Sequence, residues 1–175
     1  MFMRLRILPV ILLAPVLLFS CKKDNAVIDN SNTNGGSNNN NVVYNVNKAT
    51  LLQLVNDVRK KGCTCGSTLM PAVGAVIWSD QLAKAAYDHS VDMNKQGYFS
   101  HTGFDGSDPA QRITAAGYYW STWGENIAEG YSTEQIVINA WLGSEDHCKN
   151  IMNGAFKDIG VGRDGNYWTQ DFGSK

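Results

Sequence analysis

Three side chains in the second half of the chain have the chemistry of a metal site or an acid–base site. His101 lies in Ser-His-Thr-Gly, Glu125 in Gly-Glu-Asn and His147 in Glu-Asp-His-Cys. We expect each of them at the end of an element or in a loop, where functional groups are usually displayed. Two imidazoles and a carboxylate suit a divalent metal such as zinc, or acid and base work near neutral pH. Their spacing matches no local metal motif, so a structural hydrogen-bond network is the alternative interpretation.

The remaining histidine has a different setting. His89 falls on one helical stripe with Leu82, Ala85, Ala86 and Met93. Such a stripe is typical of the buried face of a helix, so we interpret His89 as a hydrogen-bonded core residue rather than a ligand. The tryptophans are interpreted as core or cleft-wall residues, since nothing in their spacing selects a sugar-stacking platform.

Four helices are predicted to carry or flank these groups. Helical spacing of apolar residues and helix-stopping glycines indicate helices over 47–62 and 79–97, and Asp-Pro starts a short one over 109–117. The fourth is predicted to begin at Ser132, which can form a capping box with Gln135.

The C-terminus has the pattern of a β-hairpin. Two strands are predicted over 157–163 and 166–172, joined by Asp164-Gly165, a strong two-residue turn signal. A third strand is expected from 73–78 or from 126–130. Helices come first and the hairpin last, without strand–helix–strand alternation, which favours an α+β fold with a small antiparallel sheet.

Composition narrows the class of protein. The 175 residues have a formal net charge of −1, and 43% of them are hydrophobic. These values favour one packed domain and give no electrostatic reason to bind nucleic acid.

The N-terminal segment has the pattern of an export signal. Two arginines precede a short apolar run that ends in Leu-Phe-Ser-Cys, which resembles a bacterial lipoprotein cleavage box. We therefore predict a signal peptide over 1–20 and a lipidated Cys21 that attaches the protein to a membrane. An Asn-rich, disordered tether is predicted over 21–46 and the folded domain over 47–175. The predicted location is the bacterial cell envelope, in the periplasm or on the cell surface.

Three further cysteines belong to the predicted domain. In an oxidising compartment we expect a disulfide between Cys148 and either Cys63 or Cys65. The alternative is a metal site built from the Cys-x-Cys pair and His147, although common zinc motifs have two or more residues between cysteines.

Several motifs occur together and in order. They are FSHTGFDGSDPAQRITAAGY, GENIAEGYS, WLGSEDHCKNIMN, IGVG and YWTQDFG. In this combination the chain resembles the bacterial CAP superfamily of SCP-like extracellular proteins, related to cysteine-rich secretory proteins, antigen 5 and pathogenesis-related proteins. The resemblance spans about residues 49–173.

The resemblance implies an α-β-α sandwich with a small, mainly antiparallel sheet between helical layers. It also implies a cleft with two histidines and two acids, which in some members binds a metal. His101 and Glu125 match two of those four positions, whereas Ser144 and Tyr167 stand where eukaryotic members have the second acid and the second histidine. His147 matches a histidine of bacterial members, and Cys65 is favoured over Cys63 as the partner of Cys148.

The leading functional prediction is a lipid-anchored binding module of the cell envelope that recognises a lipid, a glycan or a protein and requires no cofactor. The competing prediction is a metal-assisted hydrolase or peptidase with Glu125 as base and His101 and His147 as partners. The absence of a recognisable nucleophile triad favours the binding module over an enzyme. A purely structural envelope protein is the third alternative.

Overall fold

The computed structural model describes residues 42–175, so the predicted signal peptide, Cys21 and most of the tether lie outside the described residues. In chain order the elements are β1 Val42–Val43, β2 Val46–Asn47, α1 Lys48–Lys61, β3 Cys63–Cys65, β4 Thr68–Met70, β5 Ile77–Trp78, α2 Asp80–Gln96, α3 Pro109–Ala115, β6 Thr122–Glu129, α4 Glu134–Gly143, α5 Glu145–Ile151, β7 Asp158–Asp164 and β8 Tyr167–Ser174. No helix in this part of the chain combines the length and the apolar character that crossing a bilayer requires.

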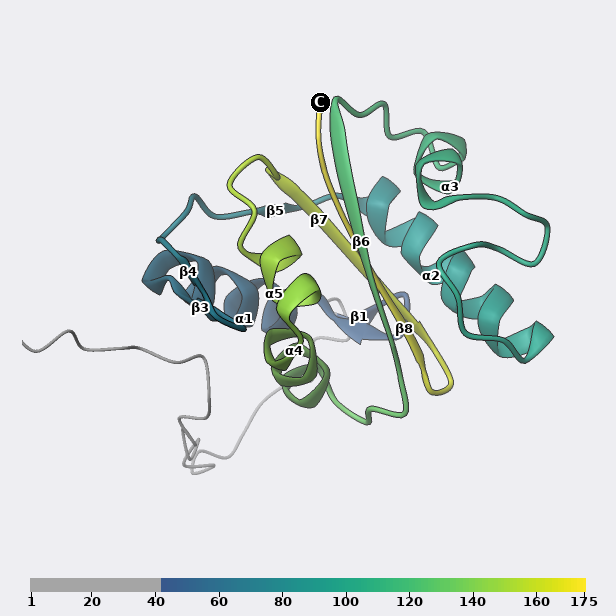
Figure 1. The fold of residues 1–175 in the computed structure, drawn as a ribbon. Helices are drawn as coiled ribbons and strands as arrows, with labels where there is room; N and C mark the ends of the chain where they lie inside the picture. The colour runs from purple at the N-terminus through teal and green to yellow at the C-terminus, as the bar shows by residue number, and fades with distance from the viewer. Residues whose placement is uncertain (1–41) are drawn as a thin grey trace, which may run out of the picture.

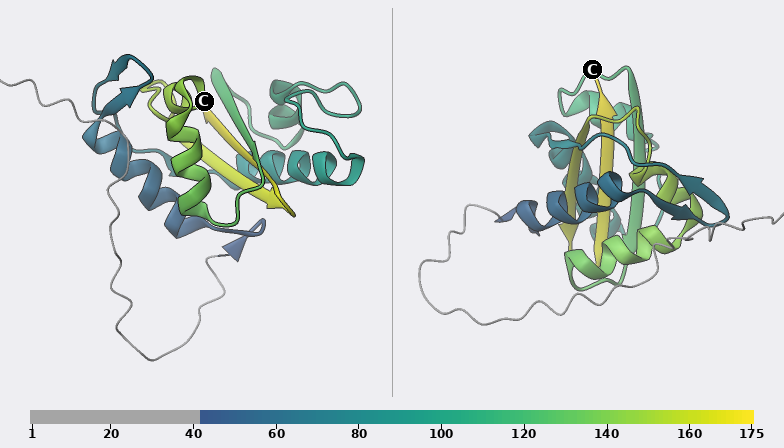
Figure 2. Two further views of the ribbon diagram at one scale, coloured as in Figure 1. Left: turned by 60° about the horizontal axis from the view of Figure 1, so that its bottom comes forward. Right: turned by 90° about the vertical axis from the view of Figure 1, so that its left-hand side faces the viewer.

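Three layers form the domain (Figures 1 and 2). The central sheet has the order β5-β7-β8-β6, with α2 and α3 on one face and α1, α4 and α5 on the other. The α+β fold and its sandwich layering are therefore confirmed. Both candidate third strands belong to the sheet, because β6 pairs antiparallel with β8 and β5 pairs parallel with β7.

The strand β7 explains how α2 packs so closely on the sheet. Successive strand residues project to opposite faces, so Ile159 and Val161 enter the core beside α1 and α4 while Gly160 and Gly162 face α2. A Cβ at Gly160 would collide with the backbone nitrogen of Ala83. The Ile-Gly-Val-Gly motif thus gives the sheet one apolar face and one face that a helix backbone can touch.

The opposite layer is held by a buried arginine and a disulfide. The Arg59 side chain on α1 is fully buried and donates hydrogen bonds to the carbonyls of Gly74, Ile151, Asn153 and Phe156. Burial lowers the pKa of this guanidinium, and the carbonyl oxygens offset part of the cost of burying its charge.

The disulfide Cys65–Cys148 joins β3 to α5 with Cα atoms 5.5 Å apart, which confirms the partner that the family resemblance favoured.

Three of the four predicted helices begin where the observed helices begin. The cap of α4 is Thr133, whose hydroxyl accepts the backbone N–H of Ile136, so the predicted start at Ser132 is wrong by one residue. With this register Val137, Ile138, Trp141 and Leu142 are the buried side chains of α4. Helix α5 was not predicted, because its sequence is polar and follows α4 directly.

The C-terminal hairpin has its turn one residue later than predicted. Asp164 still pairs with Tyr167, so the two loop residues are Gly165 and Asn166. Of these two, Gly165 has the positive φ, +55°. A positive φ at the first loop position alone is typical of a type II′ turn, because a type I′ turn has a positive φ at both loop positions.

A short hairpin lies just before the predicted domain boundary. Val42–Val43 pairs with Val46–Asn47 in a short hairpin, and Val46 is buried. The predicted boundary at residue 47 therefore lies inside an ordered segment.

The close packing of α2 predicts that Gly160→Ala is destabilising. The added methyl collides with backbone, which cannot rotate away, so we expect a loss of about 3 kcal/mol or more in the free energy of unfolding. Urea unfolding measures it. The matched control is Gly143→Ala at the end of α4, where a Cβ meets nothing within 4 Å and alanine should stabilise by about 0.5–1 kcal/mol. Equal stabilities of the two variants would contradict the packing argument.

Candidate functional site

The centre of the candidate site is the carboxylate of Glu125 on β6. Its side chain is 1% exposed, and both oxygens are engaged. Oε1 accepts the Nδ1–H of His101 at 2.7 Å, and Oε2 accepts an N–H of Arg112 on α3 at 2.7 Å. The prediction that His101 and Glu125 lie together is therefore matched by a direct hydrogen bond, and Arg112 is a partner that sequence reasoning missed.

The loop between α2 and α3 brings His101 to this carboxylate. Arg112 donates to the backbone carbonyls of His101 and Ser107 as well as to Glu125. The buried His89 holds the start of the loop through a contact of 2.9 Å between Nε2 and the carbonyl of Ser100. His89 is thus the hydrogen-bonded core histidine that its stripe predicted, and it indirectly positions His101.

A second carboxyl group lies beside Glu125. Asp171 on β8 is the cross-strand partner of Glu125 and is 2% exposed. Burial raises the pKa of Asp171 well above its ordinary value, and the charge of Glu125 raises it further, while Arg112 acts in the opposite direction. The two neighbouring acids therefore differ in their surroundings: Glu125 pairs with Arg112, whereas burial beside a carboxylate disfavours the charged form of Asp171.

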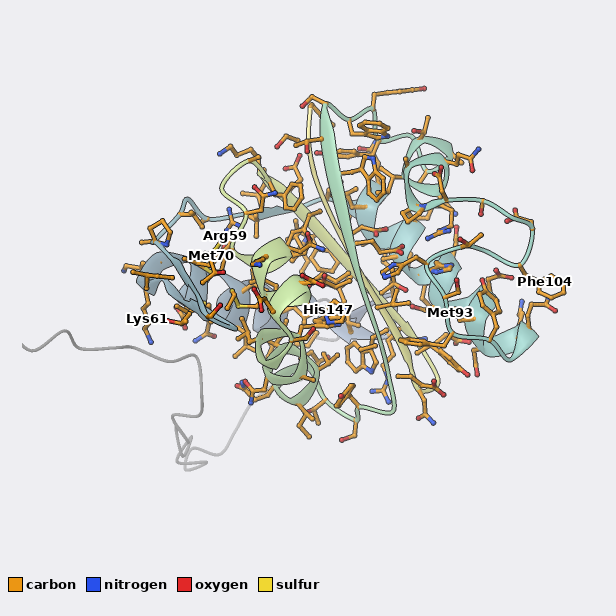
Figure 3. All side chains as sticks on the ribbon, in the orientation of Figure 1. Arg59, Lys61, Met70, Met93, Phe104 and His147 are labelled. Atoms are coloured by element: carbon orange, nitrogen blue, oxygen red, sulfur yellow. A yellow bond between two sulfur atoms is a disulfide. The ribbon has the colours of Figure 1, made fainter. Side chains whose placement is uncertain are left out.

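The other face of β6 carries a hydrogen-bond network that fixes α5. Asn126 donates to the carbonyl of His147 and to Gln170, and Asn150 donates to Asn126 and to the carbonyl of Glu125. Glu125 and Asn126, consecutive residues of the Gly-Glu-Asn motif, thus project to opposite faces of the strand. His147 and Ser144 come from α5 and from its N-cap, and His147 is labelled in Figure 3.

A pocket of about 300 Å³ lies along the free edge of β6, where residues from both faces of the strand line it. Its apolar wall includes Phe99, Ile127, Tyr131 and Trp141, and its polar lining is Glu129, Ser144 and His147. The indole N–H of Trp141 donates to the carbonyl of Ile127, which fixes that ring as a wall. Tyr167 is not in the lining but its ring lies 6.5 Å from that of Phe99. We call this the Ser144 pocket.

The structure corrects two positional predictions. Glu125 lies within strand β6 and His147 within helix α5, so only His101 occupies the expected loop. Neither hydrogen bond of the Glu125 carboxylate comes from His147, but His147 interacts electrostatically with His101. Burial lowers the pKa of His147, and the positive charge of His101 lowers it further, while Asp146 acts in the opposite direction. Phe99 in the pocket and His101 at Glu125 belong to the same loop, which places both parts beside edge strand β6.

The donors do not fit a preformed divalent metal site. Within residues 42–175, the atoms of His101, Glu125 and His147 do not lie within 4.8 Å of one another; the group that does consists of cysteines. Both oxygens of Glu125 are already committed, and the Arg112 guanidinium beside them repels a cation. The same contacts place one hydrogen-bond donor on each oxygen of Glu125, which leaves fewer lone pairs for a general base.

Comparison with known proteins agrees with this architecture. A model of the cysteine-rich secretory protein family (CAP) matches residues 52–172. The uncharacterized protein YkwD of Bacillus subtilis is 41% identical over 95 residues, which is 53% of this chain and 37% of that protein. The chain covers 28% of a second relative, the uncharacterized membrane protein YlbC of the same organism, with 35% identity over 54% of this chain. It therefore spans about a third of the length of these relatives.

Solved structures show the same fold. An extracellular protein containing an SCP domain from Bacillus anthracis superposes with a TM-score of 0.67 and 28% identity, over 81% of this chain and 45% of that chain. An outer surface protein from Borrelia burgdorferi superposes with a TM-score of 0.63 and 24% identity, over 73% of this chain and 92% of that one.

The charge coupling across β6 gives a prediction for His101→Ala. Removal of a like charge should raise the pKa of His147, because His101 is one of the two causes that lower it. Titration of the histidine ring protons by NMR measures this. His89 is the internal control, since burial, Glu125, Arg112, Ser100 and Asp92 determine its pKa and His101 does not. An unchanged His147 titration would mean that the two histidines do not share one electrostatic site.

Proposed function

Because the chain belongs to the cysteine-rich secretory protein (CAP) family, we propose that it is an exported, lipid-anchored binding module of the cell envelope. The N-terminal pattern of two arginines, an apolar run and Cys21 supports the anchor. The likeness to an extracellular SCP-domain protein supports a place outside the cytoplasm. The Ser144 pocket is the binding site in this proposal.

Among the three predicted ligand classes, lipid, glycan and protein, the lining of the Ser144 pocket favours a lipid, specifically a small amphipathic one. Six apolar or aromatic side chains surround a space of about 300 Å³, which suits one hydrocarbon chain or one ring system. Ser144 and His147 offer hydrogen bonds at one place on the wall. Glu129 adds a negative charge, so a hydroxyl-bearing end suits the pocket better than a carboxylate.

The Glu125 site acts as the support of this pocket rather than as a reaction centre. Arg112 and His101 fix the loop that contributes Phe99 to the pocket wall. Asn150 and Asn126 fix the helix that contributes His147. The metal-assisted hydrolase is less well supported, because its proposed base accepts two hydrogen bonds and its three ligands are not assembled.

Filling the pocket should abolish binding. The probe is monodecanoylglycerol, an apolar chain with a hydroxyl-bearing head, and the change is Ala140→Phe on α4, which lines the pocket. We expect saturable binding by the wild type, measured by calorimetry below the micelle concentration, and at least a tenfold loss in the variant. The control is Ile136→Phe, one turn earlier on the same helix and 46% exposed outside the pocket, which should bind like the wild type.

The two other ligand classes are outcomes of the same assay. Saturable binding of a glycan strand or an envelope protein by the wild type and by Ala140→Phe alike, with no binding of monodecanoylglycerol, would refute the pocket as the ligand site.

The anchor has its own test. Cys21→Ser should eliminate fatty-acid labelling and detergent-phase partitioning, because stable anchoring of this kind depends on acyl chains attached to one residue. Metabolic labelling of the bacterial host with a fatty acid measures it, and Cys63→Ser is the matched cysteine control that should keep its label. Labelling that persists in Cys21→Ser would exclude lipidation at that residue.

A further inference from the structure

The three cysteines of the described chain gather their sulfur atoms in one buried cluster. Cys63 and Cys65 are alternate residues of β3 and therefore project from the same face of the strand, toward Cys148 on α5. The Sγ atom of Cys63 lies 3.7 Å from that of Cys148 and 4.0 Å from that of Cys65. At 4%, 0% and 0% exposure, all three are shielded from solvent.

We propose that this cluster binds a thiophilic metal ion when the Cys65–Cys148 disulfide is reduced. Sulfur ligands about 2.3 Å from a zinc-like ion stand about 3.8–4.0 Å from one another, whether the arrangement is tetrahedral or trigonal. Two edges of the cysteine triangle already have nearly this length. Only the third edge has to open, by separation of the two sulfurs that the disulfide now joins.

The disulfide and the metal site exclude each other. A dithiol reductant supplies two electrons and two protons, so that Cys65 and Cys148 become thiols while the reductant becomes a disulfide. Binding of a divalent ion then displaces the three thiol protons and forms three metal–sulfur bonds. Thiolate sulfur is the ligand that zinc, cadmium and copper(I) favour. The redox state of Cys65 and Cys148 therefore decides whether the metal site exists. Cys63 supplies the third sulfur ligand in addition to the two cysteines of the disulfide.

This inference goes beyond the proposed ligand pocket and uses none of its side chains. The cluster lies between β3 and α5, whereas the pocket lies between α4, β6 and the loop after α2. Failure of one proposal therefore leaves the other standing. They meet only through α5, which carries both Cys148 and His147.

The test is a cadmium titration of the full-length protein in detergent, reduced with dithiothreitol and then freed from it without oxygen. We expect an ultraviolet thiolate-to-cadmium absorbance that saturates at about one ion per chain. Cys63→Ser should weaken the affinity on the order of 100-fold or more, since loss of a direct ligand should exceed the 10–100-fold cost of losing an outer-shell partner. His101→Ala is the control for the cleft and should titrate like the wild type.

Circular dichroism spectra recorded during the cadmium titration report whether the reduced chain is folded, so that each outcome can be interpreted. If reduction unfolds the chain, cadmium should restore the helical signal in the wild type but not in Cys63→Ser. The proposal is overturned if the wild type shows no saturable band, if Cys63→Ser binds as tightly as the wild type, or if an unfolded reduced chain stays unfolded with cadmium.

Discussion

The site of this protein is organised by a buried carboxylate, Glu125, whose negative charge must be compensated. The Glu125 side chain is almost completely buried, and an unpaired charge in such a place costs several kcal/mol. Arg112 and His101 supply the compensation, and Arg112 extends it to two carbonyls of the loop after α2. Burial and the charge of Glu125 raise the pKa of the neighbouring Asp171. One strand position thereby fixes a loop and a helix and contributes to the raised pKa of a second acid.

Two geometric features link that carboxylate to a pocket at the free edge of the sheet. β6 is an edge strand, so groups on both of its faces meet at its free side. Glu125 and Asn126 project to opposite faces, and their networks hold Phe99 and His147 respectively. The close approach of α2, allowed by Gly160 and Gly162, sets the start of the loop through His89. Helix packing, loop position and pocket shape are therefore physically linked.

The sequence predicted the elements whose signals are local. Caps and stop glycines identified α1, α2 and α3, and the alternation of the C-terminal residues identified the hairpin. The family motifs indicated the layers, the disulfide partner and the pairing of His101 with Glu125. The parallel pairing of β5 with β7, the partner Arg112 and the raised pKa of Asp171 were missed, because they depend on contacts between distant segments. Helix α5 was missed since its residues are polar and its buried face is short.

The central claim is that the loop after α2 and helix α5 form the walls of one ligand site. NMR titration of isotope-labelled protein with monodecanoylglycerol tests this most directly, because it reports every contacted residue at once. The account predicts that signals of Phe99, Tyr131, Ser144 and His147 shift together and saturate with one dissociation constant. Shifts confined to other surfaces, or different dissociation constants for Phe99 and His147, would contradict it.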